Sequence, residues 1–403
     1  MSVVFDPIIS NFFYTLSLIP HLTRPKDISQ RSIIETEHFP FISVLMTFYH
    51  ENREDIDMTI SSLINQTYPR DKFEILMMVE PDDTEVQSYV EDCVKRLREY
   101  GIAGRIIVSD GKLRIKPHAL NLGIEQAKGE YCAFYDASDD IEKDQLEKAI
   151  LLMKEKDYDV VQAKVLRRGS SLLSRFLLID TVFWFQKYIP LILKFAKGFP
   201  LSGEGLFIRR SVLKESGNFP EVLTEDAYLG LILSEKNKRF ALVESVVTEK
   251  APKNIKAHII QKLRWHRGYL TCLKKLFHSK MSLKRKFFFL LPFSSPITCA
   301  LAFIGWLIII SHYFSLILFP SLEINISWMQ SPLYTKGIYY WSVALAYVGI
   351  PLIFLSYTSI LLESSMKKYI PLIILIPFYW MFVGFCSTTS IFRGTKRWGK
   401  TER

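Results

Sequence analysis

The sequence is poor in cysteine, glycine and proline, and these shortages exclude several classes of protein. Its 403 residues include five cysteines, an odd number without a C-x-x-C pair, so the spacing predicts neither a disulfide framework nor a zinc site. Glycine and proline number 18 each and 49% of the residues are hydrophobic, which excludes collagenous, low-complexity and disordered chains. We therefore expect a folded protein of two or three domains in a reducing compartment.

The glycine-rich loops that cradle phosphates are also missing. No G-x-G-x-x-G follows the first predicted strand, and no G-x-x-x-x-G-K-[ST] occurs anywhere in the chain. These motifs mark dinucleotide enzymes and P-loop nucleotidases. Any nucleotide bound by this chain must therefore be held by other groups.

Long apolar stretches without Asp, Glu, Lys or Arg are concentrated near the C-terminus. They are Phe287–Phe319, Gly337–Leu362 and Tyr369–Phe392. Each reaches the roughly 20 residues that cross a bilayer as a helix. Pro292 and Pro296 break the first stretch, so its start is expected to lie along the interface. We expect transmembrane helices and a basic C-terminal tail over residues 287–403.

The N-terminus carries a shorter apolar stretch. Residues 8–19 are too few to span a bilayer and lack a basic leader. We expect residues 1–40 to form an N-terminal segment with an interfacial helix.

Between these ends, short β-rich runs alternate with helical patterns. The predicted strands are Phe41–Phe48, Phe73–Glu80, Gly104–Val108, Tyr131–Tyr135 and Tyr158–Leu166. Such alternation predicts an α/β domain with a mainly parallel sheet over residues 41–286. Sheets of this kind bind ligands at the carboxyl ends of their strands.

Residues 171–200 are rich in Leu, Phe, Trp and Ile and contain few charges. Amphipathic helices lying against a membrane are one interpretation, and packing in the protein core is nearly as strong an alternative.

Acidic residues follow two of the predicted strands. The first cluster is Glu80, Asp82 and Asp83, and the second is Asp136, Asp139 and Asp140. Carboxylates at a sheet edge suit Mg²⁺ or Mn²⁺ together with substrate phosphates, although helix capping would equally explain them. Lys112, Arg114 and Lys116 lie between the clusters, where cations could meet a diphosphate.

Two further groups of residues could carry chemistry. Glu225 and Asp226 follow Thr224, a natural N-cap, so they are either first-turn capping residues or candidates for a catalytic base. In the helical pattern near residue 261, the spacing i, i+3, i+4 places Gln261, Arg264 and Trp265 on one face. A guanidinium suits diphosphate oxygens and an indole suits the apolar face of a sugar ring, while an interfacial Trp with a snorkelling Arg is the alternative.

Taken in order, these residues resemble glycosyltransferase family 2, the GT-A fold enzymes that include cellulose, hyaluronan, chitin and poly-N-acetylglucosamine synthases. The resemblance covers about residues 40 to 285. It is carried by VLMTFYHEN at 44–52, QTYP at 66–69, EPDD at 80–83, KPHALN at 116–121, YDASDD at 135–140, SGEG at 202–205, TED at 224–226 and QKLRW at 261–265.

The resemblance implies inverting transfer from a nucleotide sugar, a UDP-sugar above all, with Mg²⁺ or Mn²⁺. It implies Asp226 as catalytic base and Asp136 with Asp139 as metal contacts, Asp140 being the other candidate for the second. The implied nucleotide contacts are Tyr49, Glu51, Glu80, Asp82, Lys116, Asp136 and Arg264. The implied acceptor contacts are Gly203, Glu204, Gly205, Glu225, Gln261 and Trp265.

The sequence departs from the family pattern at several positions. Thr47 and His50 stand where Pro and Asn are common, Glu80 with Pro81 replaces an Asp pair, and Ser138 occupies the middle position of D-x-D. The ending KRWGKTER loosely resembles the W-G-T-R ending of chitin and hyaluronan synthases. Three full spans would place this basic tail opposite the catalytic domain, so we expect one apolar stretch to be re-entrant, interfacial or folded back as two short passes.

The expected function is that of a multi-pass enzyme of the cell membrane with a cytoplasmic catalytic domain, extending a polysaccharide. Single-sugar transfer to a lipid carrier or glycolipid, as in ceramide glucosyltransferases, is the first alternative, and a non-catalytic membrane-anchored binding module is the second. A glycoside hydrolase would not need the basic segment.

The net charge of +10 is confined to one region. Residues 251–286 contain eleven Lys or Arg and no Asp or Glu, while the rest of the chain holds 40 basic and 41 acidic residues. This basic segment adjoins the first apolar stretch, so we expect it to face anionic membrane lipids and not nucleic acid.

Overall fold

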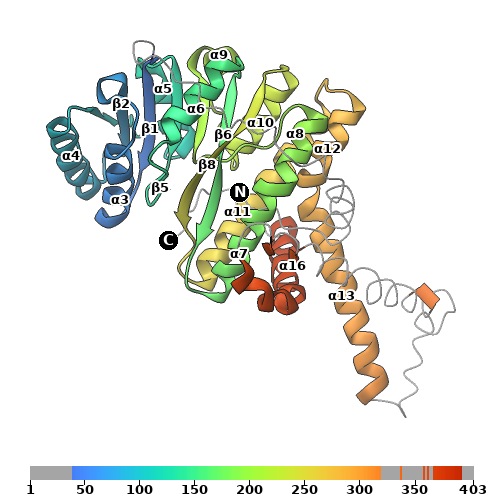
Figure 1. The fold of residues 1–403 in the computed structure, drawn as a ribbon. Coiled ribbons are helices and arrows are strands. Elements are labelled where there is room, and N and C mark those ends of the chain that lie inside the picture. The colour runs from blue at the N-terminus through green and yellow to red at the C-terminus, as the bar shows by residue number, and fades with distance from the viewer. Residues whose placement is uncertain (1–38, 319–335, 338–356, 359–360, 363–365, 393–403) are drawn as a thin grey trace.

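The structure is a computed structural model of the chain, and it describes residues 39–318, 336–337, 357–358, 361–362 and 366–392 (Figure 1). Nearly all of the predicted N-terminal segment, most of the second apolar stretch and the basic tail lie outside the described residues. The boundaries expected for these parts stay predictions.

An eight-stranded sheet organises the first part of the described chain. Its strands are β1 Ile42–Phe48, β2 Phe73–Val79, β3 Ala103–Val108, β4 Tyr131–Tyr135, β5 Asp140–Ile141, β6 Val160–Arg168, β7 Leu206–Arg209 and β8 Phe240–Lys250. The spatial order is β3-β2-β1-β4-β7-β6-β8-β5. β3, β2, β1 and β4 are all parallel, and β6 pairs parallel with β8. All five strands predicted from the sequence are therefore confirmed.

The other half of the sheet differs from the prediction. β7 runs antiparallel to both β4 and β6, and β5 is antiparallel to β8, so the sheet as a whole is mixed. None of β5, β7 and β8 stood out in the sequence. β5 and β7 are too short to give a periodic pattern. β8 alternates buried residues with half-buried or exposed ones, and Glu244 and Glu249 interrupt its apolar character.

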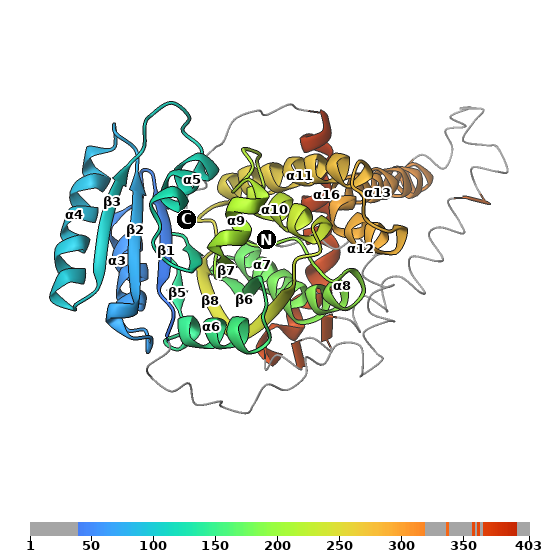
Figure 2. The ribbon, with the colours of Figure 1, turned by 90° about the horizontal axis from the view of Figure 1, so that it is seen from above.

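Helices cover both faces of the sheet, because side chains alternate across each strand. On β1, Val44 and Met46 pack in one cluster with residues of α3 Arg53–Ile64, α4 Thr84–Glu99 and α6 Gln145–Glu155. Leu45, between them, packs on the other face with α5 Lys116–Gln126. Figure 2 shows this layering from above.

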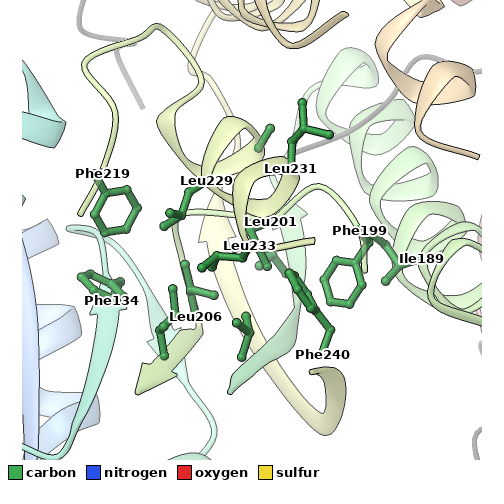
Figure 3. Close-up of a cluster of buried hydrophobic side chains, with 14 of the residues drawn as sticks. Phe134, Ile189, Phe199, Leu201, Leu206, Phe219, Leu229, Leu231, Leu233 and Phe240 are labelled. Carbon is green, nitrogen blue, oxygen red and sulfur yellow. The ribbon is translucent and has the colours of Figure 1, made fainter. Parts of the chain in front are cut away.

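The second half of the domain extends the core on the α5 face of the sheet. Its helices are α7 Leu172–Phe183, a π-helical turn Trp184–Tyr188, α8 Ile189–Ala196, α9 Arg210–Ser216 and α10 Glu225–Glu235. Leu229 and Leu233 of α10 lie on the side of the helix that faces Phe134 of β4 and Leu206 of β7, and Leu231 lies on the opposite side (Figure 3). This packing fixes the position of the first turn of α10 relative to the carboxyl end of β4.

Longer helices complete the described chain. They are α11 Ile255–Phe277, α12 Leu283–Phe293, α13 Ser295–Leu318 and α16 Ile376–Phe392. A 3₁₀ segment, Lys367–Leu375, precedes α16. A short 3₁₀ turn, Arg70–Lys72, also precedes β2 in the sheet domain. Asn254 caps α11, because its side chain accepts a hydrogen bond from the Ala257 N–H at 2.9 Å. α13 projects away from the sheet domain in both views (Figures 1 and 2).

Two continuous helical segments among the described residues are long and apolar enough to cross a membrane by length and composition. Lys367–Phe392 has a mean hydropathy of 2.0, and Leu172–Ala196 has 1.4. α12 and the first part of α13 would make a third as a broken span, bent by 52° beside Pro292, as the prolines predict. However, 78% of the apolar stretch of Leu172–Ala196 is buried in the protein. Core packing therefore accounts for most of residues 171–200.

Candidate active site

A cavity of about 220 Å³ opens at the carboxyl ends of β1, β2 and β4. All but three of the residues predicted for the site line this cavity. The predicted residues that do line it are Tyr49, Glu51, Glu80, Lys116, Asp136, Gly203, Glu204, Glu225, Asp226, Gln261, Arg264 and Trp265. The structure therefore brings together side chains that are more than 200 residues apart in the sequence.

The loop after β4 presents Asp136 to the cavity. Its carboxylate pairs with Lys116 at the start of α5, with Nζ to Oδ1 at 2.5 Å. Burial alone would lower the pKa of Lys116, but Asp136, Glu225 and Glu204 raise it above its ordinary value. Lys116 is therefore a permanent cation in the site.

Asp139 lies beneath this loop and does not line the cavity. Its Oδ2 accepts a hydrogen bond from the Asp136 N–H at 2.8 Å, and Ser138 between them has a left-handed φ of 70°. Burial and the nearby Asp136 raise the pKa of Asp139 well above its ordinary value. Its Oδ1 is buried and accepts no hydrogen bond from any described residue. Asp140 is exposed on β5, where it accepts a hydrogen bond from Ser62 at 3.3 Å.

The acidic loop after β2 divides its residues between cavity and surface. Glu80 lines the cavity, and burial raises the pKa of its carboxyl. Asp82 does not line the cavity. It forms an ion pair at 2.8 Å with Arg114, which does line the cavity, so Asp82 positions a lining residue. Asp83 caps α4 and accepts a hydrogen bond from the His50 N–H at 2.5 Å, which ties together the loops after β1 and β2.

The first turn of α10 presents Glu225 and Asp226 to the same cavity. Asp226 Oδ1 accepts a hydrogen bond from the Ala227 N–H at 2.7 Å. Burial and the neighbouring Glu204 raise the pKa of Asp226. Burial and Asp226 raise the pKa of Glu225 to about 8. Both carboxyl groups of this turn therefore hold protons more readily than free carboxyl groups do.

Two glycines keep the space around this turn open. A Cβ on Gly203 would lie 3.1 Å from Lys116 Nζ and 3.7 Å from Asp226 Oδ2, so the bare backbone here separates a cation from the candidate base. Gly205 lies behind the wall with a φ of 60°, where a Cβ would meet Val247 and Ala163.

α11 brings the Q-x-x-R-W residues to the cavity as the helical spacing predicts. Gln261, Arg264 and Trp265 all line it. The Trp265 ring is only 7% exposed, since Arg167 Cζ and Lys262 Nζ each lie 5.1 Å from its centroid. The indole is therefore more enclosed than an open stacking platform would be.

Arg167 and Glu249 are lining residues that the sequence did not predict. They end the parallel strands β6 and β8, which pair Arg167 with Glu249 in register. The Arg167 side chain lies 2.5 Å from Glu249 Oε2 and 3.4 Å from Glu204 Oε1. Charged residues near the ends of buried strands could have indicated these two positions. Glu249 could be recognised in this way only after β8 had been predicted as a strand.

The chemistry of the donor atoms fits a divalent cation. No group of three or more His, Cys, Asp or Glu side chains with metal-binding geometry occurs in the part of the chain that the structure describes. Mg²⁺ and Mn²⁺ do not need one, because they are commonly bound by one or two carboxylates together with substrate phosphates. Asp136 supplies such a carboxylate, and Asp139, whose buried Oδ1 accepts no hydrogen bond from a described residue, is the neighbouring one.

Comparisons with known proteins agree with this geometry. A family model described as Glycosyl transferase family group 2 matches residues 133–385, and one described as Glycosyl transferase family 2 matches residues 43–217. A Bacillus subtilis protein described as a probable glycosyltransferase, YdaM, is 25% identical over 256 residues, which are 62% of this chain and 60% of that protein. Glucomannan 4-beta-mannosyltransferase 2 of Arabidopsis thaliana is 24% identical over 60% of this chain and 46% of its own length.

A solved structure is similar over nearly the whole chain. The mannosyltransferase from Pyrobaculum calidifontis, in complex with GDP-Man and Mn²⁺, aligns over 96% of both chains with a TM-score of 0.59 and 17% identity. At this identity the likeness concerns the fold. This chain spans about half the length of the plant relative and less than two thirds of the bacterial one.

Proposed function

This chain belongs to glycosyltransferase family 2, whose models match more than half of it, and from that premise we propose that it transfers a sugar from a nucleotide sugar to an acceptor hydroxyl with inversion. The observation that carries the proposal is a single cavity that joins a half-buried carboxylate, Asp226, to the cations Lys116 and Arg264. A base for a hydroxyl and positive groups for a diphosphate are the two requirements of this reaction.

The proposed step begins with the acceptor hydroxyl beside Asp226. Asp226 takes the hydroxyl proton while the acceptor oxygen forms a bond to the anomeric carbon from the face opposite the leaving group. The bond from that carbon to the diphosphate oxygen breaks, and its electron pair leaves with the nucleoside diphosphate. The raised pKa of Asp226 favours proton uptake at this point, because a more basic carboxylate is the better proton acceptor.

The leaving group requires positive charge. Lys116 stays protonated beside Asp136, and Arg264 adds a planar guanidinium suited to phosphate oxygens. We propose that Asp136, with Asp139 as the second contact, holds Mg²⁺ or Mn²⁺, which would offset charge on the diphosphate. The Mn²⁺ bound by the Pyrobaculum calidifontis protein supports a divalent cation here.

The shape of the cavity determines which nucleobase and which sugar the donor carries. Both can be identified by assay with a panel of nucleotide sugars. UDP-sugars are the first donors to test, and GDP-sugars belong in the same panel because the structural neighbour binds GDP-Man. We propose a membrane-bound enzyme with its catalytic domain on the cytoplasmic side, which extends a polysaccharide. Single-sugar transfer to a lipid-linked acceptor is the second candidate, and the enclosed position of Trp265 favours it by leaving less open aromatic surface for a long glycan.

The test is Asp226→Asn, which preserves shape and removes the base. We expect loss of transfer by at least about 100-fold with nucleoside diphosphate affinity unchanged, since base catalysis contributes about 10² to 10⁴. Asp71→Asn, an exposed aspartate outside the cavity, is the matched control. A variant that kept half the normal rate would show that Asp226 is not the base.

A further inference from the structure

A buried threonine of α3 holds the loop that follows β4. Thr59 is 0% exposed, so its hydroxyl depends on partners within the protein. Its Oγ1 accepts a hydrogen bond from the Asp139 N–H at 2.9 Å and donates one to the Asp136 carbonyl oxygen at 3.1 Å. The single hydroxyl therefore bridges the first and last residues of the segment 136–139, which we call the acidic loop.

The same part of α3 contacts the acidic loop through its backbone. The Ser138 N–H donates a hydrogen bond to the Asp55 carbonyl oxygen at 3.0 Å. This oxygen also lies 3.4 Å from the Thr59 hydroxyl, which is a longer distance than the one from Thr59 to the acidic loop. The Asp55 carboxylate pairs with Lys250 Nζ at 2.5 Å, so one turn of α3 joins the acidic loop to the end of β8.

The acidic loop has a conformation that needs such support. Ser138 has a left-handed φ of 70°, which residues other than glycine rarely adopt unless their surroundings hold them there. Within the loop, the Asp136 N–H donates a hydrogen bond to Asp139 Oδ2 at 2.8 Å. Removal of the Thr59 hydroxyl would take a partner from a buried N–H and a carbonyl at the two ends of the loop. The loop would then be less constrained to this conformation.

We propose that Thr59 is a positioning residue for the divalent cation, because it fixes the acidic loop before the cation binds and so orients the Asp136 carboxylate. The inference rests on the proposed function, in which Asp136 holds Mg²⁺ or Mn²⁺. It goes beyond that function by assigning a role to a residue outside the lining of the cavity. Groups that hold metal ligands in place commonly contribute about 10-fold to 100-fold to metal affinity.

Mn²⁺ binding to the whole chain in detergent tests this role without an acceptor. The paramagnetic resonance signal of free Mn²⁺ is lost on binding, so a titration with UDP or GDP present gives a Kd, after correction by a titration without protein. Thr59→Val keeps the shape of the side chain and removes both hydrogen bonds. We expect the Kd for Mn²⁺ to rise by about tenfold or more in this variant.

Two further variants separate the hydroxyl from a general effect on α3. Thr59→Ser keeps the hydroxyl and should hold the Kd within about threefold of the unaltered value. Ser61→Ala is the matched control on the same helix, because the exposed Ser61 hydroxyl donates to the Asp57 carbonyl oxygen within α3 at 2.6 Å. This control should leave the Kd within about twofold.

Asp136→Asn distinguishes failure of the inference from failure of the proposed function. We expect this variant to abolish Mn²⁺ binding. A folded Thr59→Val variant that binds Mn²⁺ as tightly as the unaltered protein, while Asp136→Asn loses binding, overturns the inference alone. Unchanged binding in Asp136→Asn, or no binding by the unaltered protein, overturns the proposed metal site and the inference with it.

Hydrogen exchange in the unaltered protein provides a test that needs no variant to fold. With divalent cations removed by a chelator, the Asp139 amide should exchange slowly, because Thr59 already accepts its hydrogen bond inside the protein. Exchange as fast as in a free peptide, slowed only when Mn²⁺ and UDP or GDP are added, would show that the cation fixes the loop. That result would overturn the role of Thr59.

Discussion

Two apolar helical regions of this protein have similar apolar character and differ in how much of their surface the rest of the protein covers. Leu172–Ala196, which we call the inner region, has a mean hydropathy of 1.4 and is 78% buried in its apolar stretch. α13, the outer region, leaves Leu301 64% exposed and Phe314 57% exposed. Lys367–Phe392 is intermediate, with 39% of its apolar stretch buried. Apolar composition alone therefore does not distinguish a helix that packs in a protein from one that faces lipid.

The difference lies in the few polar groups that each region carries. The inner region contains Asp180, which is 2% exposed and lies 3.9 Å from Lys262 Nζ of α11. Tyr379 of α16 donates a hydrogen bond to Asp180 at 2.6 Å. Lys262 in turn lies over the ring of Trp265. α13 carries no Asp, Glu, Lys or Arg.

This comparison gives the inner region a role in the active site. Asp180 and Lys262 connect α7, α11 and α16 directly behind a cavity residue, whereas the outer region projects away from the sheet domain (Figure 1). A buried charge inside an apolar helix therefore indicates a specific partner elsewhere in the fold. The absence of one is compatible with a surface that packs against lipid.

The largest expected difference comes from placing a charge in each region. Leu177→Arg would bury an unpaired cation at a side chain that is 0% exposed, and we expect it to lower the free energy of unfolding by about 4 kcal/mol or more. Leu301→Arg should lower it by less than about half as much in detergent, because that side chain is 64% exposed and the long Arg side chain can place its charge among the detergent head groups. Thermal denaturation in detergent measures both. Equal losses in the two variants would mean that the regions do not differ as described.

A smaller effect is expected from the ion pair behind Trp265. Lys262→Met leaves Asp180 buried without its cation, which should lower the free energy of unfolding by about 3 to 5 kcal/mol. Adding Asp180→Asn removes the stranded charge while keeping an acceptor for Tyr379, so the double variant should recover much of the loss.

The kinetic readout of the same variants tests whether the pair positions Trp265. If it does, the folded double variant should show a raised KM for the acceptor with the KM for the donor unchanged. Additive losses in stability would instead show that Asp180 and Lys262 are not coupled.

The sequence predicts the parallel half of the fold well and the remainder less well, for physical reasons. β1, β2, β4 and β6 are short runs of mostly buried residues, β3 ends in three β-branched residues, and these patterns are local. Tyr49, Glu80 and Asp136 lie in loops directly after such strands, so the strand ends also indicate part of the site. Arg167 and Glu249 depend on the pairing of β6 with β8, which is set by contacts between distant segments.

The same limit explains the inner region. The sequence of residues 171–200 favours a membrane-facing segment only slightly over a core segment, because Asp180 and Lys262 are 82 positions apart and no periodic pattern joins them. Asp139 is another example. Its spacing from Asp136 suits a shared metal, yet a left-handed Ser138 turns the Asp139 side chain beneath the loop, and a backbone conformation of this kind leaves no trace in residue spacing.

The smallest expected effect on stability comes from a spin label, which tests whether α13 faces lipid or water. Nitroxides on Leu301→Cys and on Val108→Cys occupy side chains that are 64% and 52% exposed, one on α13 and one at the end of β3. The five native cysteines are all buried, and burial raises the pKa of Cys93 to about 11 and that of Cys132 to about 12, which disfavours the reactive thiolate. The label should therefore go to the introduced thiol.

In reconstituted membranes we expect oxygen, which partitions into lipid, to relax the label at position 301 more strongly than a water-soluble nickel complex does. The order should be reversed at position 108, since an apolar side chain at the surface of the sheet domain faces water. Both substitutions should change the free energy of unfolding by less than about 0.5 kcal/mol, so any difference in relaxation reports the surrounding solvent and not a change of fold. The same order of relaxation at both positions would mean that α13 is surrounded by water. The exposed apolar surface of α13 would then have to be covered by a protein partner and not by a bilayer.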